Sequence, residues 1–216
     1  MKTKIIILTL LAISSFLFGQ KFQKAVIENI DGSTKTGFVN GKSLSDSKEI
    51  KFKADENSKV EPILKSSVKS IDFSSTNGKT YHIDNILLTN EKKTKTTSEW
   101  MLKVVSGYYD LFVIADYSFD KEGNLTLSTD YRAGKDLPEF YYFIKKTSEK
   151  YADTFALYSP SPTYFGLHKI LKEGVNKFMA DDKSLVEKVE KKKLSTKNIE
   201  QIVKEYNEFK KANGSI

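Results

Sequence analysis

The sequence predicts an α+β protein, in which an antiparallel, strand-rich region at residues 20–158 precedes about three helices at residues 159–216. Apolar and polar residues alternate through much of the front region, and Asp31-Gly32 and Asn77-Gly78 mark tight turns between alternating runs. Beyond the segment SPSP, apolar residues recur every three or four positions instead of every two. We expect the strands to form a sheet, a small barrel or a sandwich, with the helices packed against it or in a small lobe beside it.

The N-terminal segment MKTKIIILTLLAISSFLFG predicts a secretory signal peptide at residues 1–19. Two lysines precede an uncharged, mainly apolar run at residues 5–18, which is shorter than the roughly 20 residues of a membrane-spanning helix. We place the cleavage between Gly19 and Gln20, although Leu17 stands where a small residue is usual. We therefore expect an exported protein, periplasmic or secreted, with no membrane span after cleavage.

The composition excludes further classes of protein and of partner. The chain has no cysteine, which excludes a lipoprotein anchor and disulfides. The net charge of +7 would fall to +5 on loss of the two N-terminal lysines, which is too dilute to indicate a particular partner. Export and the lack of any RNA-binding or zinc-finger motif argue against nucleic acid as a partner.

Eight to ten short strands are expected. Beyond the two turn-flanking pairs, the runs that predict them are KEIKFKA, NILLT, WMLKVV at residues 100–105, YYDLFVIADY at 108–117, a run around Leu125 and Leu127, PEFYYFIKKT and ADTFALYS. The run from Trp100 is nearly continuous in apolar residues, so its strands should be central and covered on both faces. The polar stretch at residues 89–99 predicts either an exposed loop or a linker between two sheets.

Three helices are expected after the prolines. Thr163 is the expected cap of the first, whose apolar face is Tyr164, His168, Leu171, Val175 and Phe178. Gly166 and Gly174 should weaken it by about 1 kcal/mol each. The pair Asp181-Asp182 should cap the second helix and Ser195 the last, and Gly214 should end it.

The lysine-rich segment EKVEKKKLSTKNIEQIVKEYNEF, residues 187–209, invites a binding interpretation. Its glutamates offset its lysines, and its apolar residues recur at helical spacing. A membrane-binding helix would show a more one-sided charge. We interpret the segment as the solvated side of a helix pair docked on a sheet.

No residue pattern indicates catalysis, a metal or a cofactor, so we predict no catalytic, metal-ligating or cofactor-binding residue. The two histidines, His82 and His168, lie in different predicted elements and are interpreted as a rim and a core histidine. The Asp181-Asp182 pair is interpreted as a helix cap, not a cation site. Neither a nucleophile elbow nor a phosphate-binding loop is present.

Aromatic residues are the one unusual feature of the composition, with 11 tyrosines and 14 phenylalanines. Adjacent tyrosines on a strand point to opposite faces, so one of each pair should be exposed. Exposed aromatic rings stack on sugars or anchor peptides. The candidate binding residues are therefore Tyr108, Tyr109, Tyr141 and Tyr142.

Three stretches carry a resemblance: the signal peptide before Gln20, the run IDGSTKTGFV with IKFKADE, ILKSSVKSIDF and GKTYHI, and the tail FMADDKSLVEKVEKKKLSTKNIEQIVKEYN. On these stretches the chain resembles a group of uncharacterised exported proteins of Bacteroidota. Some members carry a cysteine after the acidic residue, where this chain has Asp182-Lys183. The resemblance implies an envelope or secreted location and implies no activity.

We therefore expect a non-catalytic binding or structural protein of the cell envelope or secreted fraction. Its partner would be a glycan, a peptide or another envelope protein. The alternative is a hydrolase whose carboxylate pair is separated in sequence and so leaves no motif. Carboxyl groups with strongly shifted pKa values in a pocket would favour that alternative.

Overall fold

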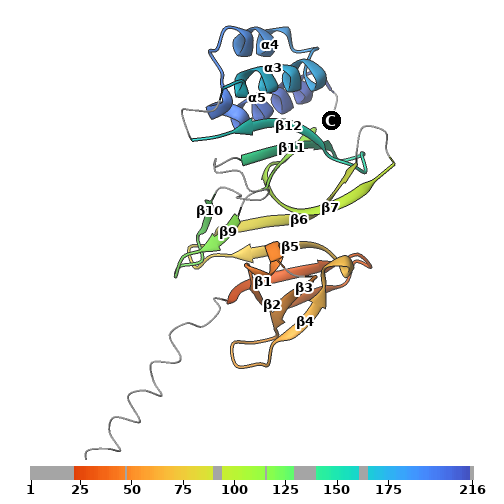
Figure 1. Ribbon diagram of the computed structural model, residues 1–216, viewed down its shortest axis with the longest axis vertical. Helices are drawn as coiled ribbons and strands as arrows, with labels where there is room; N and C mark the ends of the chain where they lie inside the picture. The colour runs from red at the N-terminus through yellow and green to blue at the C-terminus, as the bar shows by residue number, and fades with distance from the viewer. Residues whose placement is uncertain are drawn as a thin grey trace, which may run out of the picture.

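The computed structural model describes residues 22–46, 48–89, 94–114, 116–128, 140–160 and 165–214. The predicted signal peptide and its cleavage site lie outside these residues, as do Thr163 and Tyr164. The α+β class is confirmed, since a ten-stranded antiparallel sheet precedes three C-terminal helices (Figure 1).

The large sheet has the strand order β12-β11-β8-β7-β6-β5-β1-β2-β3-β4, and β9 and β10 form a separate hairpin. The bounds are β1 Phe22–Asn29, β2 Thr34–Asn40, β3 Glu49–Lys53, β4 Glu61–Leu64, β5 Val68–Ser74, β6 Thr80–Thr89, β7 Thr96–Val105, β8 Tyr109–Ile114, β9 Asp116–Phe119, β10 Leu125–Ser128, β11 Phe140–Lys146 and β12 Asp153–Tyr158. Short helical turns lie at Ser43–Asp46 (α2), Lys65–Ser67 (η2) and Thr196–Asn198 (η3).

Both predicted tight turns are confirmed. Gly32 joins β1 to β2 with φ +83°, and Gly78 joins β5 to β6 with φ +82°. These left-handed conformations are the reason for glycine at the two positions, because any side chain there would be strained.

The number and lengths of the strands differ from the expectation. Twelve strands lie in the described part of the chain, and the predicted strand NILLT is the second half of the ten-residue β6. The loop or linker predicted at residues 89–99 is shorter than expected. Strand β7 already begins at Thr96, where it pairs with Thr89 of β6. The sequence does not predict β4, because Glu61 and Pro62 hide its alternation, although an edge strand tolerates proline.

The part of the sheet from β6 to β12 curls back on itself. After β11 the chain returns to the end of β6, where the Ala152 amide donates to the Leu87 carbonyl oxygen at 3.0 Å. The central strands are covered on both faces, as predicted: Trp100 and Leu102 of β7 point into one apolar core, while Met101 points into another.

Three apolar cores result. The helix-side core joins the helices to β8, β11 and β12 and centres on Leu111, Phe155, Leu171, Ile202 and Tyr206. The front core lies among β1 to β9 and centres on Ile27, Ile50, Ile71, Phe73 and Ile83. The third core lies on the opposite face of β6, β7, β8 and β11 and contains Ile86, Met101, Phe112, Ile114, Phe143 and Ala152.

The helices α3 (Leu167–Phe178), α4 (Lys183–Glu190) and α5 (Ile199–Ala212) pack together at the β12 end of the sheet (Figure 1). Asp182 caps α4 by accepting from the Leu185 amide at 3.0 Å, which confirms that cap. Ser195 forms a capping box with Asn198 at the start of η3, which runs directly into α5.

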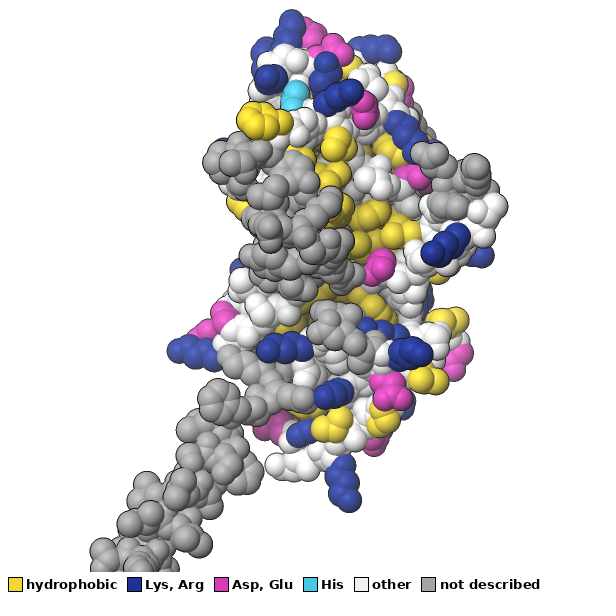
Figure 2. All heavy atoms as spheres, viewed as in Figure 1, with side chains coloured by type: hydrophobic (Ala, Val, Ile, Leu, Met, Phe, Trp, Pro, Cys, Tyr) yellow, Lys and Arg dark blue, Asp and Glu magenta, His cyan; other side chains and the backbone are white. Residues whose placement is uncertain are grey.

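The lysine-rich segment is the solvated side of a helix pair, as predicted. Lys188 of α4 pairs with Glu205 of α5 at 2.9 Å. Lysines and acidic residues are interspersed at the helical end of the face shown in Figure 2. In the part of the chain that the structure describes, no helix has the length and apolar character needed to cross a bilayer.

Candidate functional site

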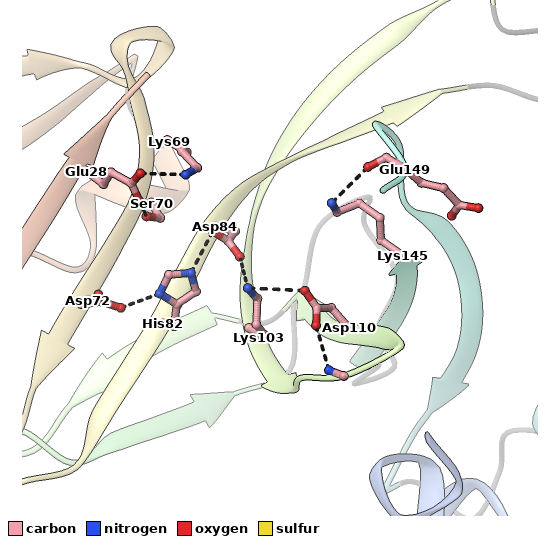
Figure 3. Close-up of polar contacts among 11 residues, drawn as sticks. Glu28, Lys69, Ser70, Asp72, His82, Asp84, Lys103, Asp110, Lys145 and Glu149 are labelled. Atoms are coloured by element: carbon pink, nitrogen blue, oxygen red, sulfur yellow. Dashed lines mark hydrogen bonds and ion pairs between the residues drawn. The ribbon is translucent and has the colours of Figure 1, made fainter. Parts of the chain in front are cut away.

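A row of charged side chains crosses four neighbouring strands on the same face as the third core (Figure 3). It runs from Asp72 of β5 through His82 and Asp84 of β6 to Lys103 of β7 and Asp110 of β8. Alternation along each strand places these residues on one face. Asp72 and His82 are direct cross-strand partners.

The contacts along the row are short. His82 Nδ1 lies 2.5 Å from Asp72 Oδ1, and His82 Nε2 lies 2.9 Å from Asp84 Oδ1. Lys103 Nζ lies 3.1 Å from Asp84 Oδ2 and 3.5 Å from Asp110 Oδ2. The side chains of Asp84 and Asp110 are each 14% exposed, so water screens these contacts only partly.

The row favours the protonated form of His82. The hydrogen bond to Asp84 raises the pKa of His82, against the effect of burial and with help from Asp72. Burial opposes ionisation of Asp84, but the hydrogen bond from His82 and the charges of His82 and Lys103 outweigh it and lower the Asp84 pKa. Because both ring nitrogens face carboxylates, the imidazole has no free nitrogen with which to act as a general base.

We predict that His82 titrates above its ordinary range and that Asp84→Asn lowers its pKa. Histidine NMR signals followed against pH would measure this, and His168→Asn would assign the two sets of signals. An unchanged His82 titration in Asp84→Asn would contradict the contact.

The same row predicts a stability effect of known sign. A folded-state pKa raised above the unfolded value of 6.5 contributes stability that is present below pH 6.5 and is lost as the pH rises through the folded pKa. The advantage of the wild type over His82→Gln should therefore be largest at mildly acidic pH, as urea unfolding at a series of pH values would measure. This difference in the free energy of unfolding should be only on the order of 1 kcal/mol. The His82 side chain is about a third exposed, so water screens its interactions with the carboxylates.

The four candidate tyrosines have different surroundings, and none of them is exposed. Tyr109 is 6% exposed and stacks on Tyr206 of α5 at 5.8 Å between ring centroids. Tyr108 is half-buried, with Lys146 and Lys210 over its ring. The expected exposed ring in this pair is therefore wrong, because helix α5, invisible in the local alternation, covers both positions.

The second pair behaves differently. Tyr141 and Tyr142 point to opposite faces as expected, since Tyr141 packs on the third core and Tyr142 on the helix-side and front cores. Both are half-buried, so the expected exposed ring is wrong in this pair too. Tyr142 lines a groove that β11 and β12 form with the helical region.

The groove has a volume of about 770 Å³ and lies between β11, β12 and the start of α5. Its residues are Tyr142, Tyr158, Thr196, Lys197, Asn198, Ile199, Glu200, Gln201 and Lys204. Tyr158 stacks on Phe140 at 6.0 Å between ring centroids, which restrains its ring at the groove wall. Burial, then the charge of Glu200, raises the pKa of Tyr142 to about 12, so its hydroxyl stays protonated at neutral pH.

No protein-family model, curated protein or solved structure matches this chain. Any function must therefore be inferred from the geometry of the row and the groove.

The other sequence candidates occupy structural positions. His168 is half-buried, with Nε2 3.0 Å from the Val189 carbonyl oxygen, so it joins α3 to α4. Asp181 accepts from the Tyr206 hydroxyl at 2.8 Å and pairs with Lys210 at 2.6 Å, so it ties the α3–α4 connection to α5 instead of capping a helix. Within the described residues, no group of three or more histidine or acidic side chains is arranged to hold a metal ion.

Proposed function

We propose that the chain is an exported, non-catalytic binding protein of the cell envelope or secreted fraction, and that the Tyr142–Tyr158 groove holds an oligosaccharide. The observation that carries the proposal is the composition of this groove, in which two tyrosine rings lie beside amide and charged side chains. The predicted signal peptide supports export.

The groove suits an uncharged or weakly charged polyhydroxyl ligand. The tyrosine rings offer apolar surface to the face of a sugar ring. Asn198 and Gln201 add amide donors and acceptors, and the protonated Tyr142 hydroxyl both donates and accepts. Glu200 pairs with Lys204 at 3.6 Å, which leaves the wall nearly balanced in charge.

The carboxyl groups argue against the hydrolase alternative. A general acid needs a raised pKa. Among the described carboxyl groups whose pKa departs from its ordinary value, including Asp84 and Asp181, every one has it lowered. The His82 imidazole, with a carboxylate at each nitrogen, is likewise unsuited to proton abstraction.

The test is a glycan array probed with the purified chain lacking residues 1–19, followed by calorimetric titration of the best glycan. Tyr142→Ala and Gln201→Ala should each weaken binding about tenfold, equivalent to about 1.4 kcal/mol. Gln201 is exposed, so its replacement carries little risk to folding.

Tyr151→Ala is the matched control, because Tyr151 is also half-buried but lies outside the groove. Its affinity should equal that of the wild type. If no glycan on the array bound the protein, or if it bound only peptides or envelope proteins in a pull-down, the oligosaccharide proposal would be refuted.

A further inference from the structure

Trp100, the only tryptophan, lines a second cavity, on the far side of the sheet from the charged row. The cavity has a volume of about 440 Å³ and lies between β6, β7 and the two turns α2 and η2. Asn85 of β6 is the direct cross-strand partner of Trp100 and also lines it. The remaining wall residues are Leu44, Lys48, Leu64, Lys65, Ser66, Ser98 and Glu99.

Asn85 is an unusual residue for this position. Asparagine is disfavoured inside strands, and the neighbouring side chains on this face, Ile83 and Trp100, belong to the front core. Its Nδ2 donates to the Val68 carbonyl oxygen at a long 3.4 Å. Its Oδ1 is buried and has no hydrogen-bond partner among the described residues. Buried polar atoms are nearly always paired, so an unpaired one needs an explanation.

To present that buried oxygen to the cavity, the amide of Asn85 has to turn or Trp100 has to move. Among the described residues, only the long bond to Val68 restrains the amide, and the terminal torsion of asparagine has a broad range. A turn of the amide, or a small movement of Trp100, would expose Oδ1 to a ligand donor. The acceptor and the indole ring would then act on one bound group.

The walls indicate an uncharged ligand. Lys65 Nζ donates to the Leu44 carbonyl oxygen at 2.5 Å, so one of its three N–H donors is already engaged. Lys48 and Glu99 bring opposite charges to the rim. Leu64, 58% exposed, adds an apolar lip.

We propose that this cavity is a second ligand site, which takes a small uncharged group bearing amide N–H or hydroxyl donors beside an apolar edge. The donor bonds to Asn85 Oδ1 and the apolar edge packs on Trp100. The proposal does not depend on the tyrosine groove, because the two cavities have no wall residue in common.

The single tryptophan makes the site directly observable. N-Acetylglucosamine, which carries an amide N–H and hydroxyls, should produce a saturable change in Trp100 fluorescence at millimolar concentration. Asn85→Val suits the strand and the apolar surroundings, so the unliganded variant should be at least as stable as the wild type to heat. Its affinity for N-acetylglucosamine should fall at least tenfold.

Two further variants keep the result interpretable. Ser98→Leu changes an exposed wall residue and should block the cavity without disturbing the core. Tyr142→Ala should leave the fluorescence response unchanged, which separates this site from the groove. No saturable response in the wild type, or an equal response in Asn85→Val and Ser98→Leu, would overturn the proposal and leave an internal water as the partner of Asn85.

Discussion

Replacing Asn207 by alanine is expected to lower the free energy of unfolding by about 3 kcal/mol, although no charge or large apolar group is removed. Asn207 lies on α5 and is 8% exposed. Its Oδ1 accepts from the Tyr109 amide at 2.9 Å, and its Nδ2 donates to the Tyr109 carbonyl oxygen at 2.9 Å. One side chain thus pairs with both backbone groups of a β8 residue, as a neighbouring strand would.

The cost arises from what alanine leaves behind. The donor and the acceptor of Tyr109 would both be buried without a partner, and each such group costs about 1–3 kcal/mol. The methyl group of alanine can neither donate nor accept a hydrogen bond, so no shift of α5 toward the sheet would restore the two bonds. Gly107 permits the close approach, since a Cβ there would lie 2.4 Å from Asn207 Nδ2.

Asn213→Ala is the matched control, at the end of the same helix. Its Nδ2 donates to the Phe209 carbonyl oxygen at 2.8 Å, but the side chain is exposed, so the change should stay within about 0.5 kcal/mol. Urea denaturation of both variants measures the difference. Equal small effects would mean that Asn207 does not hold the helices to the sheet.

The same contact shows where sequence reasoning stops. The two tight turns, the two helix caps and the alternating strands depend on residues a few positions apart, and their pattern predicts them. Asn207 and Tyr109 are 98 positions apart. Helical spacing places Tyr206 on the buried face of α5, but no local pattern distinguishes an asparagine that pairs with a strand from one that faces water.

The sequence predicts the turn within the charged row but not the pairing. A two-residue turn at Asn77-Gly78 would place Asp72 opposite Ile83. In the structure the Ser75 amide donates to the Lys79 carbonyl oxygen, the loop between them has three residues, and the register shifts by one to pair Asp72 with His82. The continuation to Lys103 and Asp110 is not predicted either, because the β6–β7 connection is longer and no tight turn sets its register. The sequence pattern therefore indicates an isolated rim histidine at His82, although the side chain lies between two carboxylates.

The tyrosine groove depends on non-local packing in the same way. Alternation correctly sends Tyr141 and Tyr142 to opposite faces, but the wall opposite Tyr142 comes from η3 and α5, about 55 positions later. At Tyr109 the local pattern suggests a residue available for binding, but α5 covers the side chain almost completely. In both cases the docking position of the helices decides exposure, and the local pattern carries no information about that position.

Gly174→Ala provides the second large effect, and its sign is opposite to that predicted by helix propensity. In an exposed helix interior this change should stabilise by about 1 kcal/mol. Here a Cβ would lie 2.2 Å from the Phe155 carbonyl oxygen and 3.2 Å from its carbonyl carbon, both in the backbone of β12. Backbone within a sheet cannot rotate away, so α3 must move and the helix-side core must loosen. We expect a loss of about 3 kcal/mol.

Gly166→Ala separates this packing effect from backbone strain. Gly166 precedes α3 with φ +90°, and a Cβ added there would meet nothing within 4 Å, so alanine should cost about 1–2 kcal/mol through conformation alone. Asn176→Ala, exposed on the same helix, should change stability by no more than about 0.5 kcal/mol. Thermal and urea unfolding of the three variants should therefore rank Gly174→Ala as the least stable. If Gly174→Ala were as stable as the wild type, α3 would not rest on β12 as closely as the structure places it, and the glycine would have no packing reason to be there.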